Sequence, residues 1–281
     1  MSPRVSVVVP AYNNGHFIAE TVQSILDQSY RDFELIIADH SSTDHTLAAI
    51  EPFQHDGRLR LLHTEAGGGA KRNWDRVSQS ASGELLKLVC GDDLIHPDAL
   101  AEQVEAFDAH PSAVLVATQR RLADARGGTV ISARGLGGLS GLVPGDLAAR
   151  RAVTAGANIF GEPACVMLKR KELEAVGWWQ DTHPYLIDQA TFIAVALRGD
   201  FVAIPKPLAT FRISSNQWSV RLATEQAKQA AGFHAKLRAT HPDLLSRRDV
   251  WVGDAKALAT SFMRRAVYVL LNHRMKHPRQ D

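Results

Sequence analysis

The first half of the chain alternates short β-rich runs with helical patterns, and this alternation constrains the fold more than any other feature. Buried strands are expected at residues 5–9, 33–38, 59–62 and 85–90. Between the first two, Ile18, Val22 and Ile25 recur at the spacing of one helix face. Because strands that alternate with helices form βαβ units, we predict an α/β fold whose central sheet is Rossmann-like, mostly parallel and flanked by helices.

The second half is less regular. Residues 126–145 hold seven glycines and predict a loop, or a loop broken by a short hairpin, that acts either as a lid or as a plain surface excursion. Further strands are expected at residues 164–168, 201–204 and 208–211, with a helix at 188–197. The pattern is helical beyond Trp218, so we divide the chain into an α/β domain, residues 1–220, and a C-terminal helical extension, residues 221–281.

Composition narrows the class of protein. With 45% hydrophobic residues the chain can bury a full core, and a net charge of +2 gives no reason to expect a nucleic-acid partner. The amino terminus lacks the apolar stretch of a signal peptide, and no run reaches the ~18 apolar residues of a membrane span, so a cytoplasmic protein is expected. Cys90 and Cys165 lie in apolar runs and are expected to be free thiols.

Polar loops follow three of the predicted strands, at residues 12–15, 39–44 and 91–93. The carboxyl ends of parallel strands meet at one edge of a sheet, which is where open α/β sheets bind ligands. These loops are therefore expected to converge on one cleft.

Two of the predicted loops carry charges suited to a metal and a phosphate. Asp92 and Asp93 repel one another at a strand end unless a cation compensates, and Mg²⁺ or Mn²⁺ is typically held by one or two carboxylates together with substrate phosphates. Alternatively, such a pair caps the helix that follows. Residues 67–73 (GGGAKRN) combine glycines and cations in a way that suits a polyanion. They lack the spacing of a Walker A loop, and no Gly-x-Gly-x-x-Gly follows the first strand, which argues against kinases and dehydrogenases.

In this order, the motifs of the chain resemble those of glycosyltransferase family 2, which has the GT-A fold. The matching segments are residues 5–13 (VSVVVPAYN), 24–28 (SILDQ), 33–39 (FELIIAD), 42–44 (STD), 71–73 (KRN), 81–84 (ASGE), 91–93 (GDD), 161–164 (GEPA), 176–178 (VGW), 188 (D) and 211–212 (FR). The resemblance covers roughly residues 4–220. It implies an inverting, metal-dependent transfer of a sugar from a nucleotide diphosphate carrier to an acceptor hydroxyl, in the synthesis of a cell-surface glycan, glycolipid or glycoside.

The resemblance also implies roles for individual residues. Asp188 matches the catalytic base, and Asp93 matches the metal ligand, with Asp92 contacting the ribose or a metal-bound water. The nucleotide-sugar pocket is expected to include Pro10, Ala11, Tyr12, Asp39, Lys71, Arg72 and Asn73. Glu162, Arg212 and Trp178 are further candidates on the acceptor or diphosphate side; a surface position for Glu162 and core packing for Trp178 are the alternatives.

Three positions depart from the family pattern. His40 stands where a second acidic residue is common, so the nucleobase of the donor is harder to infer from related enzymes. As the carrier, UDP or dTDP is preferred over GDP. Gln189 follows Asp188 in place of the common Glu-Asp pair, and Ser214 lies where many members carry a histidine near the metal. Gln217-Trp218 lacks the Arg of processive synthases, so a single-addition enzyme is expected.

The C-terminal segment predicts an amphipathic helix, with Ala259, Met263, Ala266 and Leu270 on one face. From residue 264 onward there are five Arg or Lys and one acid. Peripheral contact with the inner face of a membrane, packing on the catalytic domain and a homodimer through these helices all stay open. For the whole chain, a non-catalytic nucleotide or sugar-binding module and a nucleotidyltransferase are the rival functions.

Overall fold

A single large sheet forms the centre of the molecule. The computed structural model describes residues 2–213 and 225–270. The sheet has the strand order β3-β2-β1-β4-β9-β6-β10-β5, with β7 paired to β6 and β8 paired to β10. Its strands are β1 Val5–Ala11, β2 Phe33–Asp39, β3 Leu59–His63, β4 Leu85–Leu88, β5 Leu94–Ile95, β6 Ala113–Asp124, β7 Thr129–Arg134, β8 Gly141–Pro144, β9 Val166–Lys169 and β10 Asp200–Ile213.

Parallel pairing is confined to parts of this sheet. Strands β3, β2, β1 and β4 run parallel, as the alternating pattern predicts, and β6 runs parallel to β10. Strand β9 is antiparallel to both of its neighbours, β4 and β6. Strands β5 and β8 are antiparallel to β10, and β7 is antiparallel to β6, so the sheet as a whole is mixed. The α/β class of the fold is confirmed. Strand β9 joins β4 of the parallel half to β6 and β10.

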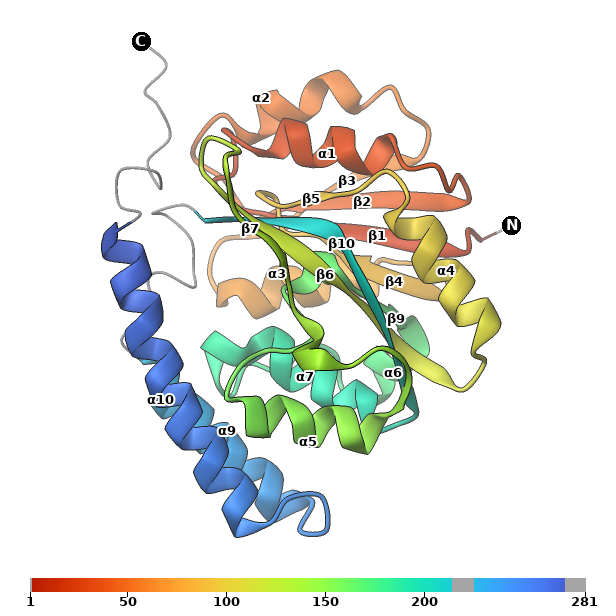
Figure 1. Ribbon diagram of the computed structural model, residues 1–281. Helices are drawn as coiled ribbons and strands as arrows, with labels where there is room; N and C mark the ends of the chain where they lie inside the picture. The colour runs from red at the N-terminus through yellow and green to blue at the C-terminus, as the bar shows by residue number, and fades with distance from the viewer. Residues whose placement is uncertain (1, 214–224, 271–281) are drawn as a thin grey trace.

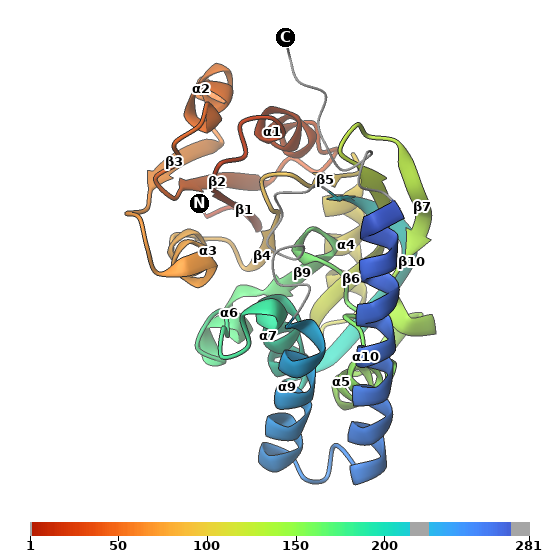
Figure 2. The ribbon, with the colours of Figure 1, turned by 90° about the vertical axis from the view of Figure 1, so that its left-hand side faces the viewer.

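Helices cover both faces of the sheet. They are α1 Ile18–Leu26, α2 Thr46–Ile50, α3 Gly69–Gln79, α4 Ala99–Ala109, α5 Gly145–Ala155, α6 Arg170–Ala175, α7 Ile187–Ala196, α9 Gln226–Thr240 and α10 Arg247–Leu270. Short 3-10 turns lie at η1 Glu51–Phe53, η2 Leu136–Gly138, η3 Pro163–Cys165 and η4 Pro184–Leu186. Helices α1 and α2 lie on one face of the sheet, and α3, α6 and α7 on the other (Figures 1 and 2).

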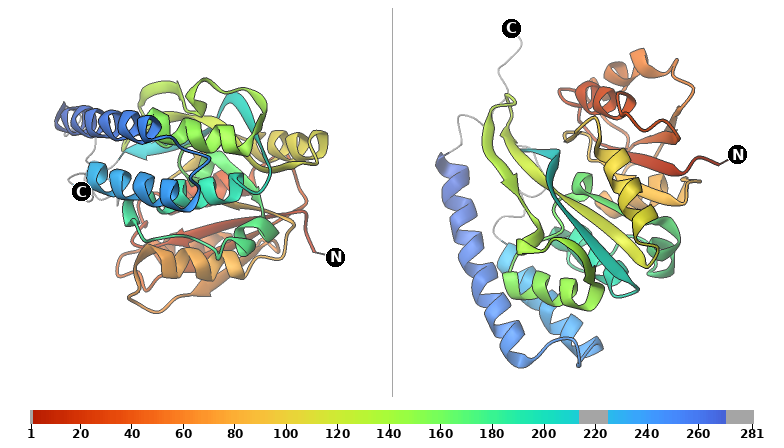
Figure 3. Two further views of the ribbon diagram at one scale, coloured as in Figure 1. Left: turned by 90° about the horizontal axis from the view of Figure 1, so that it is seen from below. Right: turned by 45° about the vertical axis from the view of Figure 1, so that its right-hand side comes forward.

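The helical extension is present as two long helices. Helices α9 and α10 lie side by side, with α10 also packed along α5 (Figure 3). None of the helices in the described ranges is long and apolar enough to cross a membrane.

Two details of the sequence-based prediction change, and one open alternative is decided. Strand β6 was not predicted, although residues 113–117 form an apolar run. The strands expected at 201–204 and 208–211 are one strand, β10, with a register shift between Ile204 and Pro207. The glycine-rich segment does contain a hairpin, because β7 returns along β6.

Candidate functional site

The loops after β1 and β2 are bound to each other by hydrogen bonds. The backbone N–H of Asn13 donates to Ser42 Oγ at 3.0 Å, and the N–H of Thr43 donates to Asn13 Oδ1 at 2.9 Å. Gly15 N–H donates to Asp44 Oδ2 at 2.9 Å. The predicted convergence of these two loops at the carboxyl edge of the sheet is therefore observed.

Tyr12 and Asp39 lie at this edge with groups available to a ligand. The Tyr12 ring is 55% exposed, and its centroid is 5.9 Å from that of His40. Asp39 is buried; its Oδ2 accepts a hydrogen bond from Ser42 N–H at 3.1 Å, whereas its Oδ1 has no partner. A buried acceptor without a donor costs about 1–3 kcal/mol, so this oxygen is suited to a donor supplied by a bound molecule. Pro10 and Ala11 are buried in β1 beside it.

His40 joins this edge to the glycine-rich loop. Its Nε2 lies 2.9 Å from the carbonyl oxygen of Gly67. Gly67, Gly68 and Gly69 all have positive φ, between 65° and 91°, a region that favours glycine. The glycines therefore allow the backbone conformation that leads into α3. His40 links this loop to the loop after β2.

The three basic-segment residues on α3 differ in what they do. Lys71 pairs with Asp75, and Arg72 pairs with Glu65 at 2.9 Å, both in partly exposed positions where ion pairs are weak and exchangeable. Asn73 is buried, and its amide is fully used: Nδ2 donates to Ala38 O at 2.8 Å and to Ala11 O at 3.3 Å, and Oδ1 accepts from Thr64 Oγ1 at 2.7 Å. Asn73 ties strands together in this structure; its side chain does not reach out toward a ligand.

Asp92 and Asp93 form the turn between β4 and β5. Asp93 is 1% exposed, and its Oδ1 accepts a hydrogen bond from the backbone N–H of Arg212 at 3.3 Å, whereas its Oδ2 has no partner. Burial, followed by the charges of Asp92 and Glu162, raises the pKa of Asp93 well above its ordinary value. A carboxylate in this state is stabilised by a cation, so these two residues fit a divalent metal ion.

The described part of the chain brings no third metal ligand to Asp92 and Asp93. Within residues 2–213 and 225–270, no three His, Cys, Asp or Glu side chains are grouped to hold a metal. The expected third-ligand position, Ser214, lies outside the described residues. A cation on Asp92 and Asp93 would thus depend on water and substrate oxygens, the shell that Mg²⁺ usually keeps.

Arg212 contacts the turn of Asp92 and Asp93 through its backbone and carries its side chain to α1. Its guanidinium pairs with Glu20 of α1 and lies over the Phe17 ring, 5.1 Å from the centroid. Its backbone is the part that meets Asp93. The Arg212 charge also lowers the pKa of Asp93, and its expected role beside a diphosphate stays a prediction.

Asp188 lies in the first turn of α7, as predicted. Its Oδ1 accepts a hydrogen bond from Gln189 N–H at 2.7 Å, and its Oδ2 accepts one from Asn158 Nδ2 at 2.9 Å. Burial raises the pKa of Asp188 to about 7, although the hydrogen bond from the Gln189 N–H lowers this pKa by a smaller amount. A carboxyl with a pKa near neutrality is suited to take a proton.

Two residues of this site were missed in the sequence. Asn158 bonds Asp188 and also donates to Gly161 O at 2.8 Å, which fixes the loop before Glu162. Arg120 of the unpredicted strand β6 is buried and pairs with Glu162, with its Nη2 3.1 Å from Oε1. Burial disfavours the charged form of Arg120, but Glu162 and Cys165 outweigh this and raise its pKa. The only signal in the sequence was a charged residue interrupting an apolar run.

The candidate carboxylates gather around one thiol. Burial raises the pKa of Cys90 well above its ordinary value, and the charges of Asp93, Asp92, Asp188 and Glu162 raise it further. Four carboxylates from three separate chain segments therefore act on the Cys90 thiol. Cys90 and Cys165 are both free, as predicted.

The aromatic residues before Asp188 face the C-terminal helices. The His183 ring lies 6.1 Å from Phe233 of α9, and the guanidinium of Arg264 in α10 lies 5.7 Å from the Tyr185 ring centroid. Trp178 is half-buried against the core with φ of 66°, a left-handed conformation that is unusual for tryptophan. Neither contact brings His183 or Tyr185 to the carboxylates.

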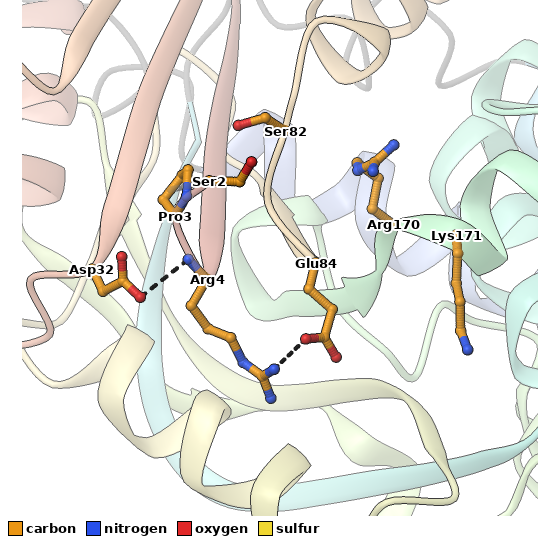
Figure 4. A pocket seen from close by; sticks show the side chains of 8 residues that line it. All are labelled: Ser2, Pro3, Arg4, Asp32, Ser82, Glu84, Arg170 and Lys171. Atoms are coloured by element: carbon orange, nitrogen blue, oxygen red, sulfur yellow. Dashed lines mark hydrogen bonds and ion pairs between the residues drawn. The ribbon is translucent and has the colours of Figure 1, made fainter.

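A cavity of about 500 Å³ lies at the opposite end of the parallel strands (Figure 4). It lies at the amino ends of β1 and β4, where Arg4 bonds Asp32 through its backbone and Glu84 through its side chain. Arg170 and Lys171 also line it and pair with glutamates outside it. None of the candidate functional residues lines it. This cavity is therefore separate from the candidate site at the carboxyl edge.

The sequence model of "Glycosyl transferase family 2" matches residues 6–175, more than half of the chain. The chain belongs to glycosyltransferase family 2.

Individual relatives match over part of their length. Glycosyltransferase GlyG of Streptococcus pneumoniae serotype 4 is 38% identical over 113 residues, which are 39% of this chain and 38% of GlyG. The poly(ribitol-phosphate) beta-N-acetylglucosaminyltransferase TarS of Staphylococcus aureus is 33% identical over 117 residues, which are 40% of this chain and 20% of TarS. The matched stretches span well under half of these relatives.

Solved structures show the same fold over almost the whole chain. Residues 1–349 of TarS in complex with UDP-GlcNAc superpose with a TM-score of 0.70 at 18% identity, covering 96% of this chain and 76% of that one. The mannosyltransferase PcManGT of Pyrobaculum calidifontis, in complex with GDP-Man and Mn²⁺, gives 0.67 at 20% identity, with 96% and 76% covered. The predicted GT-A fold is confirmed.

Proposed function

We propose that this protein is an inverting, metal-dependent glycosyltransferase that moves a sugar from a nucleotide diphosphate carrier to an acceptor hydroxyl. The observation that carries the proposal is the meeting of Asp92, Asp93, Glu162 and Asp188 around Cys90, at the edge where the loops of β1 and β2 also converge. Relatives that act in surface-polymer synthesis, such as TarS, favour a cell-surface glycan as the product.

Asp188 is the proposed base. The acceptor oxygen attacks the anomeric carbon from the side opposite the diphosphate, the bond to the diphosphate oxygen breaks, and Asp188 takes the hydroxyl proton. The pKa of about 7 lets this carboxyl be ionised at neutral pH and still bind the proton firmly. Asn158 holds the carboxyl in place, because its amide also bonds to Gly161 O.

Charge on the departing diphosphate needs compensation. Mn²⁺ or Mg²⁺ held by Asp93 and Asp92 would neutralise part of that charge. Lys71 and Arg72 are proposed to exchange their exposed ion pairs for phosphate oxygens. At the other end of the donor, the free Oδ1 of Asp39 and the exposed ring of Tyr12 are proposed to hold the nucleoside.

The carrier is proposed to be UDP or dTDP. TarS, which is similar to this chain in sequence and in fold, binds UDP-GlcNAc, whereas PcManGT binds GDP-Man on the same fold. His40 occupies the position beside Asp39 and is the first residue we expect to influence the choice of base.

A thermal-shift titration tests nucleotide and metal together. The purified chain is melted with UDP, dTDP, GDP, CDP and ADP sugars, each with and without Mn²⁺. Saturation with one donor is expected to raise the melting temperature by roughly 5–10 °C in the presence of Mn²⁺. The Asp93→Asn variant is expected to lose the part of the shift that requires the metal.

The outcomes separate the rival functions. A shift for one donor, followed by release of its nucleoside diphosphate when acceptor is supplied, supports the transferase. A shift without turnover under any acceptor would indicate a non-catalytic binding module. No shift with any sugar nucleotide would contradict the proposal.

A further inference from the structure

Lys87 of β4 is a fully buried lysine whose amine binds neutral oxygens. Its Nζ donates to Ala164 O at 2.6 Å, to Gln103 Oε1 at 2.9 Å and to Val166 O at 3.5 Å. Burial lowers the pKa of Lys87 to about 7, so the positive charge is held at an energetic cost. Lysine is almost never fully buried unless it is paired, and an apolar side chain would avoid the cost. The oxygens that Lys87 binds therefore indicate its role.

Side chains from three separate elements hold the carbonyl groups of the turn η3. Lys87 of β4 binds Ala164 O. Gln103 of α4, which is itself buried, donates from Nε2 to Cys165 O at 2.9 Å. Thr118 of β6 donates to the same oxygen at 3.4 Å. The backbone of η3 is therefore fixed to the sheet and to α4 by a buried hydrogen-bond network.

The turn η3 is continuous with the residues of the candidate site. The N–H of Cys165 donates to Glu162 O at 2.8 Å. A Cβ on Gly161 would lie 2.7 Å from Cys165 Sγ, so Gly161 packs closely on the same residue. We call residues 161–165 the Glu162 segment. Because its parts contact one another this closely, whatever holds η3 also holds the backbone of Glu162.

The side chain of Glu162 brings a negative charge to the carboxylates of the proposed metal site. Burial is the largest cause of the raised pKa of Asp93, followed by the charges of Asp92 and Glu162. Arg120 holds the Glu162 carboxylate, with Nη2 3.1 Å from Oε1. A negative charge that favours a proton on Asp93 also favours a divalent cation there. The position of Glu162 therefore bears on cation binding.

Lys87 continues a link between β4 and the strand that follows η3. Backbone pairing joins β4 to β9 at Leu85 and Leu86, which face Lys169 and Leu168. At the next residue of β4, the side chain of Lys87 reaches across to η3. Strand β4 leads at its other end into the turn of the paired aspartates.

We infer that Lys87 is a positioning residue that fixes Glu162 relative to Asp92 and Asp93. Its backbone belongs to the strand that precedes the two aspartates, and its amine holds the segment that carries Glu162. One side chain thus sets the spacing between carboxylates that come from distant parts of the chain. The consequence for cation binding rests on the proposed function, whereas the positioning itself does not.

Amide hydrogen exchange tests the positioning without any ligand. Methionine is similar in length to lysine but cannot donate, so Lys87→Met should loosen η3. Exchange in the peptide of residues 161–166 should become about tenfold faster, and exchange in β1 and β2 should stay as in the wild type. Gln103→Leu removes the donor to Cys165 O and one acceptor of Lys87, so it should loosen the same peptide; it is the second variant if Lys87→Met does not fold.

Mn²⁺ titration in the presence of UDP gives a readout that loss of stability alone would not change. Lys87→Met and Glu162→Gln should each weaken Mn²⁺ binding by about threefold or more. The double variant should bind no more weakly than Glu162→Gln, because both changes act through one carboxylate. Loss of a positive charge at Lys87 would by itself strengthen cation binding, so weaker binding reports the displacement of Glu162. Partial unfolding would lower the number of sites and leave the affinity of each site unchanged.

Lys169→Met is the matched control. Lys169 also donates to a backbone carbonyl, Pro111 O at 2.7 Å, but it lies at the other end of β9 from η3. This variant should match the wild type both in the exchange of residues 161–166 and in Mn²⁺ affinity.

Equal exchange of residues 161–166 in the wild type, Lys87→Met and Gln103→Leu would overturn the inference. Stronger Mn²⁺ binding by Lys87→Met would also overturn it, by showing that Lys87 acts through its charge, as would losses of affinity that add in full in the double variant. A wild-type chain that binds no Mn²⁺ would contradict the proposed metal site. The exchange measurement would still decide whether Lys87 holds the Glu162 segment, so the two failures are distinct.

Discussion

Asp188 combines a chemical role with an unfavourable environment. Its carboxyl is desolvated, which raises its pKa to about 7. The hydrogen bonds from Gln189 and Asn158 stabilise the ionised form and keep the pKa from rising further. A carboxyl in this state binds a proton well and is still about half ionised at neutral pH, which are the properties a general base requires.

Removing the charge of Asp188 should separate binding from turnover. Asp188→Asn keeps the size of the side chain but cannot accept the proton, so transfer should fall by about 10²–10⁴-fold. The donor-induced thermal shift should stay within experimental error of the wild type, because the proposed base acts on the acceptor hydroxyl and not on the nucleotide. Unchanged turnover in the variant would remove Asp188 from the role of base.

The pH profile should report on the neighbour of Asp188. Transfer should rise with pH up to about 7 and then level off, because the carboxyl must be ionised to act. Asn158→Ala removes a donor that favours the ionised form, so the rising limb should move to higher pH by about one to two units. A variant that loses activity equally at every pH would instead show that Asn158 only maintains the loop.

At the scale of elements, the start of α5 is constrained by the end of α7. A Cβ on Gly145 would lie 1.8 Å from Ala196 O and 2.2 Å from Gly199 O, both backbone atoms. No side chain can move aside to relieve these contacts, so the helices themselves would have to separate. This contact positions α7, and with it Asp188.

Substitution of this glycine should therefore be costly. Gly145→Ala should lower the melting temperature by roughly 5–10 °C through overpacking. Gly57→Ala, at a position where an added Cβ meets nothing within 4 Å, is the matched control and should melt with the wild type. Similar melting of both variants would mean that α5 and α7 adjust more freely than their packing indicates.

At the scale of the whole molecule, the helical extension is part of the packed structure. Phe233 and Leu237 of α9 and Ala257 of α10 belong to the main hydrophobic core, and α9 contacts the turn η4 that precedes α7. We propose that residues 221–281 stabilise the segment that carries Asp188, in addition to any contact they make outside the chain.

A truncated chain tests this. Removal of residues 221–281 should lower the melting temperature and reduce transfer more than donor binding, because the contacts of His183 and Tyr185 with α9 and α10 are lost while the loops of β1 and β2 are untouched. A truncated chain that melts and turns over like the full chain would show that the extension is a separate appendage.

The sequence by itself determined the local elements and the loops that carry charge. Strands β1 to β4, the helices between them and the positions of Asp92, Asp93 and Asp188 follow from periodicity and from ordered motifs, because neighbouring residues specify them. Only the sequence order was needed to expect that these loops meet at one edge of the sheet.

Tertiary structure decided what depends on distant partners. The antiparallel pairing of β6 with β9, the strand that follows Glu162, brings Arg120 to Glu162, 42 positions along the chain. A loop places Asn158 against Asp188. For α10, Ala259 and Met263 of the predicted apolar face are exposed, and the small residues Gly253, Ala257 and Ser261 pack inward. The side chains of Ala266 and Leu270 lie outside the described part of the chain. Periodicity gives the faces of a helix, but the surface it meets selects the one that is buried, and against α5 close approach favoured small side chains over large ones.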